Sequence, residues 1–208
     1  MHPVAPLLGT LAVLLSACGA AEPTWAPDAQ VESARYAHDA PPSLTLVTMV
    51  HTRDGRGGHA SLLINADERL LFDPAGTWQN PGAPERNDVL HGITPALWQQ
   101  YLDYHARQGV EVILQEQTVP LAVALQAKAA VQAYGAVPKA QCSIATTRIL
   151  HGLPGYGRMR ETVWPHKAMQ DFALLPGVTA RVIRDDDDPD NRPMLARQIA
   201  AAQAAAAD

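Results

Sequence analysis

Two residues, Cys142 and His59, combine a reactive side chain with a position that suits catalysis. Cys142 stands immediately before the apolar run 143–150, which has helical spacing and is followed by Gly152 and Pro154. The first amides of a helix lack partners within the helix, and the positive end of the helix dipole stabilises an anion, so this position favours a thiolate. The same amides can bind the oxyanion of a tetrahedral intermediate. The sequence therefore predicts a nucleophile, although a buried, inert cysteine is the more common case.

His59 begins the strand-like segment HASLLI after a glycine-rich turn. The short connection 65–68 predicts a hairpin centred near residue 66, and folding the chain there brings His59 opposite Asp73 or within one residue of it. A carboxylate in that place can accept the imidazole N–H, fix the tautomer and stabilise the imidazolium. The sequence thus predicts a histidine base oriented by Asp73. An Asx turn explains Asp73 equally well, since a proline follows it.

The segments around these residues predict strands and helices that would position them. Strand-like runs cover 44–50, 59–64, 69–73, 110–119 and 178–183. Helical spacing begins at Pro95 after the N-cap Thr94 and stops at Gly109, and it recurs over 120–134 and 143–150. The order of elements predicts an α+β fold, in which helices pack on a small antiparallel sheet. The alanine-rich tail from Leu195 can be helical but offers little to pack against.

The composition excludes several classes of protein. With 208 residues, 47% of them hydrophobic and 18% charged, the chain suits one domain with its own core, and it is neither disordered nor an integral membrane bundle. A net charge of −5 leaves no basic face, so we expect no nucleic-acid partner. The histidines lack metal-ligand spacing such as HExxH, and the acidic run 185–188 lacks the EF-hand pattern. We therefore expect no metal, no cofactor and a monomer.

The first segment is typical of an export signal. Residues 7–17 form an uncharged apolar run that is too short to span a bilayer and ends in small residues. The tetrapeptide Leu-Ser-Ala-Cys at 15–18 resembles the lipobox of bacterial lipoproteins, although the residues before the apolar run include no Lys or Arg. This resemblance implies that Cys18 is lipidated, and Gly19 in place of Asp implies the periplasmic face of the outer membrane. The alternative is an ordinary cleaved signal with a coincidental cysteine.

The expected layout has four parts. They are a lipoprotein signal over 1–18, a tether over 19–42, a catalytic domain over 43–184, and an acidic loop with an alanine-rich tail over 185–208. Lipidation of Cys18 would leave Cys142 as the one thiol of an exported domain. An unpaired thiol in an oxidising compartment is a liability unless it is used or buried.

Three short motifs resemble a circularly permuted NlpC/P60 domain. They are GHASLLI over 58–64, FDPAG over 72–76, and the pair Cys-Ser at 142–143 that opens a helix. NlpC/P60 domains are papain-like cysteine hydrolases, and in the permuted members the histidine strand precedes the cysteine helix. The resemblance covers roughly residues 44–155. It implies that Cys142 is the nucleophile, that His59 is the base, and that Asp73 takes the place of a polar third residue.

Three further residues are weaker candidates. Gln141 and Ser143 flank the nucleophile and could contribute to an oxyanion hole. Trp78 could line a substrate groove, but packing as a loop anchor explains it better. The chain order His, Asp, Cys also occurs in chymotrypsin-like cysteine proteases, but those are all-β double barrels, and the helices expected around the cysteine argue against that fold.

The sequence leaves three functions open. The first is an envelope-anchored thiol hydrolase that cleaves an amide, with cell-wall stem peptides as the substrate that the resemblance implies. The second keeps the fold and nucleophile but acts on acyl-lipids, as a hydrolase or an acyltransferase. The third is a non-catalytic lipoprotein that binds peptidoglycan or a partner. An apolar groove near Cys142 would favour acyl-lipid, and a polar groove rimmed by Arg or Asn would favour stem peptide.

Overall fold

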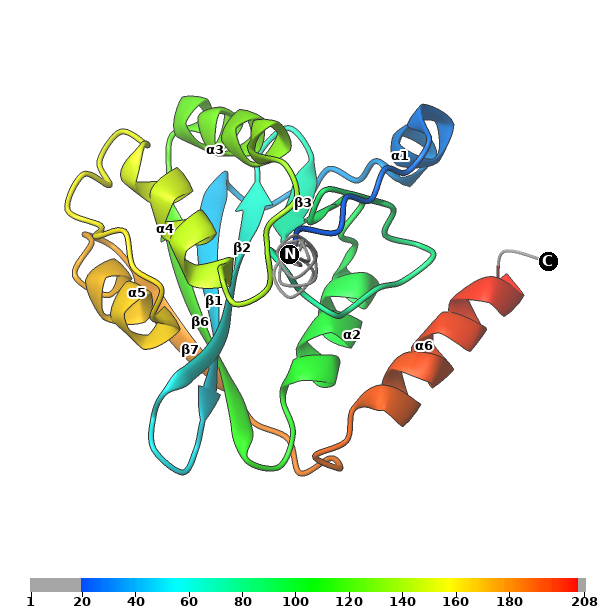
Figure 1. Ribbon diagram of the computed structural model, residues 1–208. Coiled ribbons are helices and arrows are strands. Elements are labelled where there is room, and N and C mark those ends of the chain that lie inside the picture. Colours follow the sequence, from blue (N-terminus) through cyan, green and yellow to red (C-terminus); the bar gives the residue numbers. More distant parts are fainter. Residues whose placement is uncertain (1–19, 206–208) are drawn as a thin grey trace, which may run out of the picture.

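The structure, a computed structural model, describes residues 20–205, and within this range one antiparallel sheet carries helices on both faces (Figure 1). The sheet order in the described residues is β4-β5-β3-β2-β1-β6-β7, and every neighbouring pair is antiparallel. The strands are β1 (Ser43–His51), β2 (Gly57–Asn65), β3 (Arg69–Phe72), β4 (Glu85–Arg86), β5 (Val89–Leu90), β6 (Val110–Thr118) and β7 (Thr179–Ile183). The helices are α1 (Asp28–Ala34), α2 (Pro95–His105), α3 (Leu121–Tyr134), α4 (Cys142–His151), α5 (Pro165–Phe172) and α6 (Arg192–Ala205). The α+β class and the antiparallel sheet expected from the sequence are confirmed.

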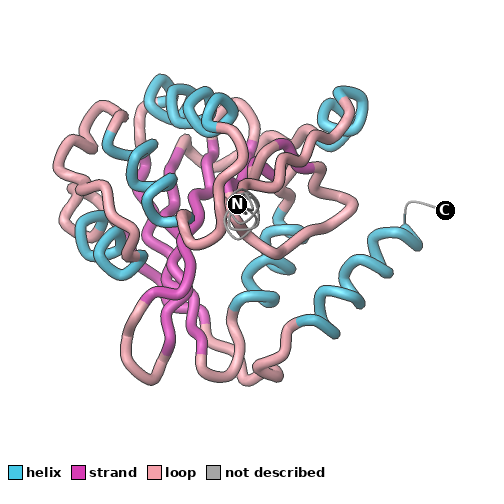
Figure 2. Tube along the Cα trace, viewed as in Figure 1, coloured by secondary structure: helices cyan, strands magenta, loops and turns pink. Residues whose placement is uncertain are grey.

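The sheet has an apolar core on each face, because side chains alternate between the two faces of a strand. On one face, Leu62 of β2 belongs to a buried cluster with α3, α4 and α5. On the other face, Leu63 belongs to a second cluster with α2, and Met194 and Leu195 of α6 pack against it. Figure 2 shows the two groups of helices on opposite sides of the strands. Coverage of both faces explains why β1 is buried along almost its whole length.

Helix α2 begins as the sequence predicted but ends earlier. The Thr94 side chain accepts a backbone N–H of the first turn at 3.2 Å, and a proline occupies the first turn. The helix ends at His105, before Gly109, so the expected stop at Gly109 was wrong. Arg107 and Val110 exchange two backbone hydrogen bonds, of 3.1 and 2.9 Å, and Gly109 has a φ of 82° in the turn between them. This tight turn feeds directly into β6 and leaves no room for another helical turn.

The elements α1, α5, β4 and β5 were not expected from the sequence. Strands β4 and β5 have two residues each, which is too few for an alternating pattern to appear. Helix α5 has eight residues and begins with Pro165, which is a usual signal for the first turn of a helix. Gly57 of β2 packs closely on this helix start, because a Cβ at Gly57 would lie 2.5 Å from Cβ of Pro165.

The segment 20–42, for which we expected a tether, contacts the domain in the structure. It contains α1, and its Thr24 carbonyl accepts the backbone N–H of Asn87 at 2.9 Å. The Asn65 side chain at the end of β2 donates to the carbonyl of Ala40 at 2.9 Å. The backbone of this segment is therefore hydrogen-bonded to the domain near both of its ends.

The C-terminal tail forms α6, which contacts the domain although none of its residues is buried. Gln198 of α6 donates to the Gln100 carbonyl of α2 at 3.0 Å. Its Oε1 atom accepts the indole N–H of Trp78 at 3.0 Å. In Figure 1, α6 lies beside α2 on the face of the sheet away from α4. The polar side chain of Gln198 thus links the tail to two parts of the domain.

The signal segment, Cys18 and Gly19 lie outside the described residues, so lipidation stays a prediction. Among the helices within residues 20–205, none combines the length and the apolar character that crossing a bilayer requires.

Candidate active site

Cys142 lies at the edge of β2, at the point where β3 stops. It is the first residue of α4, and it is 7% exposed. Its sulfur accepts hydrogen bonds from the backbone N–H groups of Ala60 and Ser143. The N–H of Ala60 is available because the ladder between β2 and β3 ends at the pair Leu62 and Phe72. The short β3 therefore creates the place that the thiol occupies.

His59 contacts both other residues of the expected catalytic set. Its Nε2 atom is 2.7 Å from Oδ1 of Asp73, and its ring also forms a hydrogen bond with the side chain of Cys142. Because Asp73 occupies Nε2, Nδ1 is the ring nitrogen left to face the thiol. The structure thus brings together Cys142, His59 and Asp73. The sequence placed Cys142 at the start of a helix, His59 on a strand and Asp73 at the end of the next strand.

The nucleophile and the base reach one another from opposite sides of the sheet. On β2, His59 shares its face with Leu63, which packs toward α2, whereas α4 packs on the other face. The His59 ring stacks on His105 of α2, with ring centroids 6.1 Å apart and planes inclined by 8°. Contact with Cys142 is possible because no β3 residue continues the ladder beyond Leu62.

The predicted hairpin register was wrong by one residue. Asn65 pairs with Arg69 and Leu62 with Phe72, so the hairpin is centred at residue 67 and not near 66. If this register is extended by one residue, Asp73 lies across from Ser61. Ser61 is the next residue after His59 on the same face of β2. The contact between Asp73 and His59 is therefore diagonal, which long side chains on one face of a sheet can bridge.

The carboxylate of Asp73 is buried, and its hydrogen bonds within the described residues all go to Oδ1. The Tyr101 hydroxyl of α2 donates to Oδ1 at 2.8 Å, and this hydroxyl also contacts Oγ of Ser61 at 2.8 Å. Oδ2 lies against Gly76, where an added Cβ would be only 1.9 Å away. A side chain at position 76 would therefore displace the carboxylate. Asp73 is 3% exposed, so water does not screen its charge from His59.

The charges of the three groups support one another. Burial lowers the pKa of His59, but the charge and hydrogen bond of Asp73 and the contact with Cys142 outweigh burial and raise this pKa to about 10. Burial raises the pKa of the Cys142 thiol, but hydrogen bonds from His59 and from two backbone N–H groups lower it overall. Burial likewise opposes ionisation of Asp73, and His59 more than compensates, so its pKa is lowered. Near neutral pH these directions favour a thiolate–imidazolium pair beside a carboxylate.

Two residues of α2 complete the surroundings of the base, and sequence reasoning missed both as functional residues. Burial, followed by the charge of Asp73, raises the pKa of Tyr101 well above its usual value, so the hydroxyl stays protonated and donates to Asp73. Burial lowers the pKa of His105 to about 4, so its ring is neutral where it stacks on His59. Tyr101 lies within the helix that the sequence predicted, and its phenolic hydroxyl was a signal that it also makes a polar contact.

The neutral state of His105 predicts that the protein loses stability as the pH falls from 6.5 toward 4. The unfolded chain binds a proton near the ordinary pKa of 6.5, whereas the folded chain does so only near pH 4. The free energy of unfolding should therefore fall across this window, by on the order of 3 kcal/mol. Urea unfolding measured across the window should show this decrease, and His105→Gln should show a shallower one. Equal slopes for the two proteins would contradict a neutral His105.

The three weaker site candidates have different outcomes. The Ser143 side chain is fully buried and its Oγ has no hydrogen-bond partner among the described residues, so only its backbone N–H reaches the site. Trp78 is buried and packs edge-on against Tyr101, with ring centroids 5.4 Å apart, which fits a loop anchor. Gln141 is exposed directly before Cys142, and its contribution to an oxyanion hole stays a prediction.

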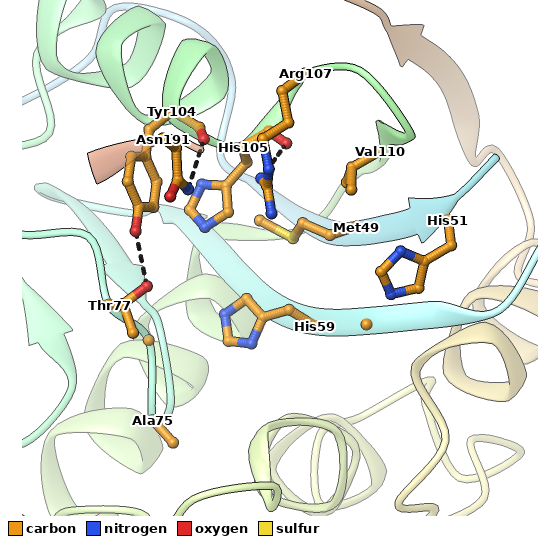
Figure 3. Close-up of a pocket in the computed structure, with 12 residues that line it drawn as sticks. Met49, His51, His59, Ala75, Thr77, Tyr104, His105, Arg107, Val110 and Asn191 are labelled. Atoms are coloured by element: carbon orange, nitrogen blue, oxygen red, sulfur yellow. Dashed lines mark hydrogen bonds between the residues drawn. The ribbon is translucent and has the colours of Figure 1, made fainter. Parts of the chain in front are cut away.

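A cavity of about 270 Å³ lies beside His59 on the α2 side (Figure 3). Its polar rim includes Arg107, which donates to the carbonyl of His105 at 2.9 Å, and Asn191, which donates to the carbonyl of Tyr104 at 3.2 Å. Among its lining residues, all in the described part of the chain, there is no Asp or Glu. The cavity therefore places a guanidinium and an amide near the base, but Cys142 is not among its lining residues. Arg107 and Asn191 also line a neighbouring cavity together with Asp103, Asp187, Asp188 and Asp190.

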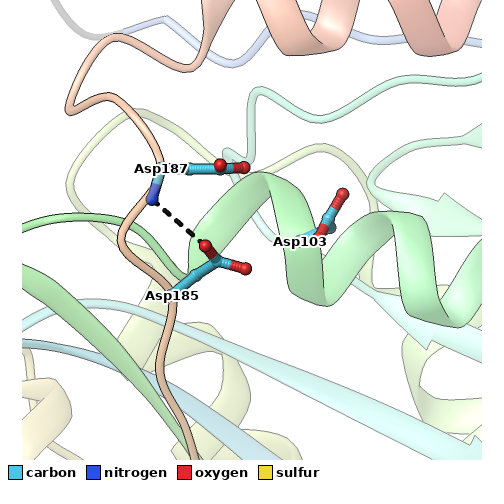
Figure 4. Close-up of side chains that lie close together, drawn as sticks. All are labelled: Asp103, Asp185 and Asp187. Carbon is cyan, nitrogen blue, oxygen red and sulfur yellow. Dashed lines mark hydrogen bonds between the residues drawn. The ribbon is translucent and has the colours of Figure 1, made fainter.

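A cluster of three aspartates lies where the acidic loop meets α2 (Figure 4). Asp103 of α2 meets Asp185 and Asp187 of the acidic loop, with one oxygen of each within 4.8 Å of the others. Burial, and then the charges of the two loop aspartates, raise the pKa of Asp103. The three carboxylates therefore repel one another. Asp185 and Asp187 are exposed, as expected for a solvated loop.

Comparisons of the chain with protein-family models, with curated proteins and with solved structures gave no match. The resemblance to NlpC/P60 domains rests on the short motifs alone.

Proposed function

We propose that the protein is a cysteine hydrolase that cleaves an amide bond through an acyl-enzyme on Cys142. One observation carries this proposal: His59 bridges a helix-terminal thiol and a buried carboxylate. This arrangement matches the nucleophile, base and orienting group of thiol hydrolases. The chain order of these residues and the antiparallel sheet also support a permuted papain-like architecture of the NlpC/P60 type.

The geometry supports a two-step reaction. The Cys142 thiolate attacks the carbonyl carbon, and the amides at the start of α4 stabilise the oxyanion. His59 donates its Nδ1 proton to the leaving amine as the C–N bond breaks, which leaves a thioester on the sulfur. His59 then accepts a proton from water, whose oxygen attacks the thioester and releases a carboxylic acid and the thiolate. Asp73 stays ionised throughout and holds Nε2 of His59.

The substrate class is proposed from the cavity beside His59. Its lining includes His59 but not Cys142, and its rim carries Arg107 and Asn191, which favours a peptide substrate over an acyl chain. Stem peptides of the cell wall carry carboxylates that a guanidinium can bind. We therefore propose stem peptides as the substrate. The signal-like start of the chain supports attachment to a bacterial envelope membrane through lipid on Cys18, at the periplasmic face of the outer membrane.

Product analysis tests this function directly. The full chain and Cys142→Ala would each be incubated with soluble stem-peptide fragments and, separately, with phospholipid vesicles, and the products identified by mass spectrometry. We expect new amine and carboxylate ends from the peptides with the wild type alone. Release of fatty acid from the vesicles and no peptide cleavage would instead support an acyl-lipid hydrolase. No product together with an unreactive thiol would support a binding protein.

The cavity predicts that Arg107 contributes to affinity for an acidic substrate. Arg107→Gln should raise KM for a stem peptide with a free carboxylate by about 10-fold, since hydrogen bonds to charged groups contribute about 1.5–3 kcal/mol. The value of kcat should change little, because the guanidinium binds and does not react. The same peptide with its carboxylate amidated should bind both proteins equally. Arg53→Gln is a matched control, because the Arg53 side chain is 90% exposed. An equal loss for both peptides would contradict the assignment.

A further inference from the structure

A two-residue turn beside the site holds an aspartate in a conformation that few residues adopt. Strands β4 and β5 are joined by Asn87 and Asp88, whose φ angles are 47° and 66°. Positive φ at both positions is the mark of a type I′ hairpin turn, in which Asn and Asp are tolerated better than most residues. The short hairpin therefore fixes the direction of the Asp88 side chain.

Asp88 accepts three backbone N–H groups, and they come from two separate segments. Its carbonyl accepts from Asp73 at 2.8 Å, and its Oδ1 accepts from Ala75 at 3.1 Å. Its Oδ2 accepts from Val137 at 2.7 Å. The backbone N–H of Asp88 in turn donates to the side chain of Glu85 at 3.2 Å, which holds the turn itself. Each oxygen of the carboxylate is thus bonded to a different segment.

The two segments that Asp88 connects are those that carry the reacting groups. Ala75 belongs to the turn directly after Asp73, and Gly76 of this turn donates to the Asp73 carbonyl at 2.9 Å. Val137 belongs to the connection that leads from α3 to Cys142. A shift of either segment changes the distance from the thiol to the histidine and its carboxylate. Misplacement of catalytic groups by about 1 Å can cost about 100-fold in rate.

We propose that Asp88 is a positioning residue that holds the Asp73 turn and the segment before Cys142 in register with one another. Its consequence for catalysis rests on the proposed function, whereas the link between the two segments does not. Asp88 touches neither substrate nor thiol, and it acts through the backbone N–H groups of Ala75 and Val137.

The test uses two substitutions that keep the turn. Asp88→Asn keeps one acceptor oxygen but replaces the other with an N–H₂ group, so one of the two segments loses its partner. Asp88→Gly tolerates positive φ and removes both acceptors. Asn87→Gly is the matched control, because it changes the neighbouring position of the same turn. Circular dichroism and thermal unfolding would establish that all three variants fold.

The first readout is the pH profile of iodoacetamide alkylation of Cys142 in the full chain, followed on the Cys142 peptide by mass spectrometry. We expect the inflection to move toward the ~8.5 of a free thiol in both Asp88 variants and to stay unchanged in Asn87→Gly. We also expect kcat to fall about 10- to 100-fold with a smaller change in KM. An Asp88→Gly profile identical to that of an activated wild type would overturn the proposal.

The second readout is hydrogen exchange, and it does not depend on catalysis. In Asp88→Gly, peptides covering 73–77 and 135–141 should both exchange faster, and in Asn87→Gly neither should. Faster exchange confined to residues 85–90 would overturn the proposal even if the wild-type thiol proved unreactive. If both segments exchange faster and the wild-type thiol is unreactive, the connection through Asp88 is supported and only the proposed function is contradicted.

Discussion

Alanine in place of His59 is expected to abolish the low-pH reactivity of Cys142. In the wild type, alkylation of the thiol should show an inflection well below ~8.5, because the His59 hydrogen bond and charge lower the Cys142 pKa against the effect of burial. In His59→Ala only burial and the two backbone N–H groups remain, so the inflection should move upward. Each unit of upward shift lowers the thiolate fraction below the inflection about 10-fold. Amide hydrolysis should be lost, since no group remains to protonate the leaving amine.

The wild-type profile should also have an upper limit. The thiolate–imidazolium pair persists until His59 loses its proton, which its pKa places near pH 10. We therefore expect kcat/KM to form a plateau that declines as the pH rises through about 10. His38→Ala is the control, because His38 lies in the N-terminal segment, where it accepts the N–H of Ala40 at 3.0 Å. A wild-type inflection that is ordinary and indifferent to His59 would make Cys142 a structural thiol.

Asparagine in place of Asp73 is expected to lower kcat/KM by on the order of 10²- to 10⁴-fold. Asparagine preserves the size of the side chain and its oxygen can still accept from Tyr101, but the negative charge is lost. Burial, which lowers the pKa of His59, would then be opposed only by the contact with Cys142, so the imidazolium is disfavoured. Kinetics and the alkylation profile should change together, with the Cys142 inflection moving upward and the alkaline limit moving downward.

A second substitution reaches the same carboxylate without changing its chemistry. Gly76→Ala would place a Cβ 1.9 Å from Oδ2 of Asp73, so the carboxylate must move away from its present position. We expect the alkylation profile of Gly76→Ala to resemble that of Asp73→Asn. Gly157→Ala is the control, because a Cβ there meets no atom within 4 Å. Wild-type behaviour of both Asp73→Asn and Gly76→Ala would show that His59 acts without this carboxylate, and Asp73 would then be a turn residue.

Local patterns in the sequence were enough to place the reactive residues on their elements. Apolar spacing after Cys142 predicted a helix that begins at this residue, and α4 begins there. The apolar segment after His59 predicted a strand, and β2 contains it. These predictions succeeded because helix and strand periods are properties of adjacent residues, and burial of one or both faces enforces them. The α+β class followed from the same patterns.

Tertiary structure alone decided how these residues meet. The hairpin register depends on the geometry of a turn. The sequence placed Asp73 across from His59 or within one residue of it, whereas the register of the structure places it across from Ser61. The sequence predicted β3 to within one residue, but it did not show that the end of this strand leaves the Ala60 N–H to the thiol. The Tyr101 hydroxyl contacts Asp73, and the Asp88 carboxylate contacts the segment before Cys142, through packing of distant parts of the chain. Such contacts leave no periodic trace in the sequence, because packing of separate elements and not local spacing determines them.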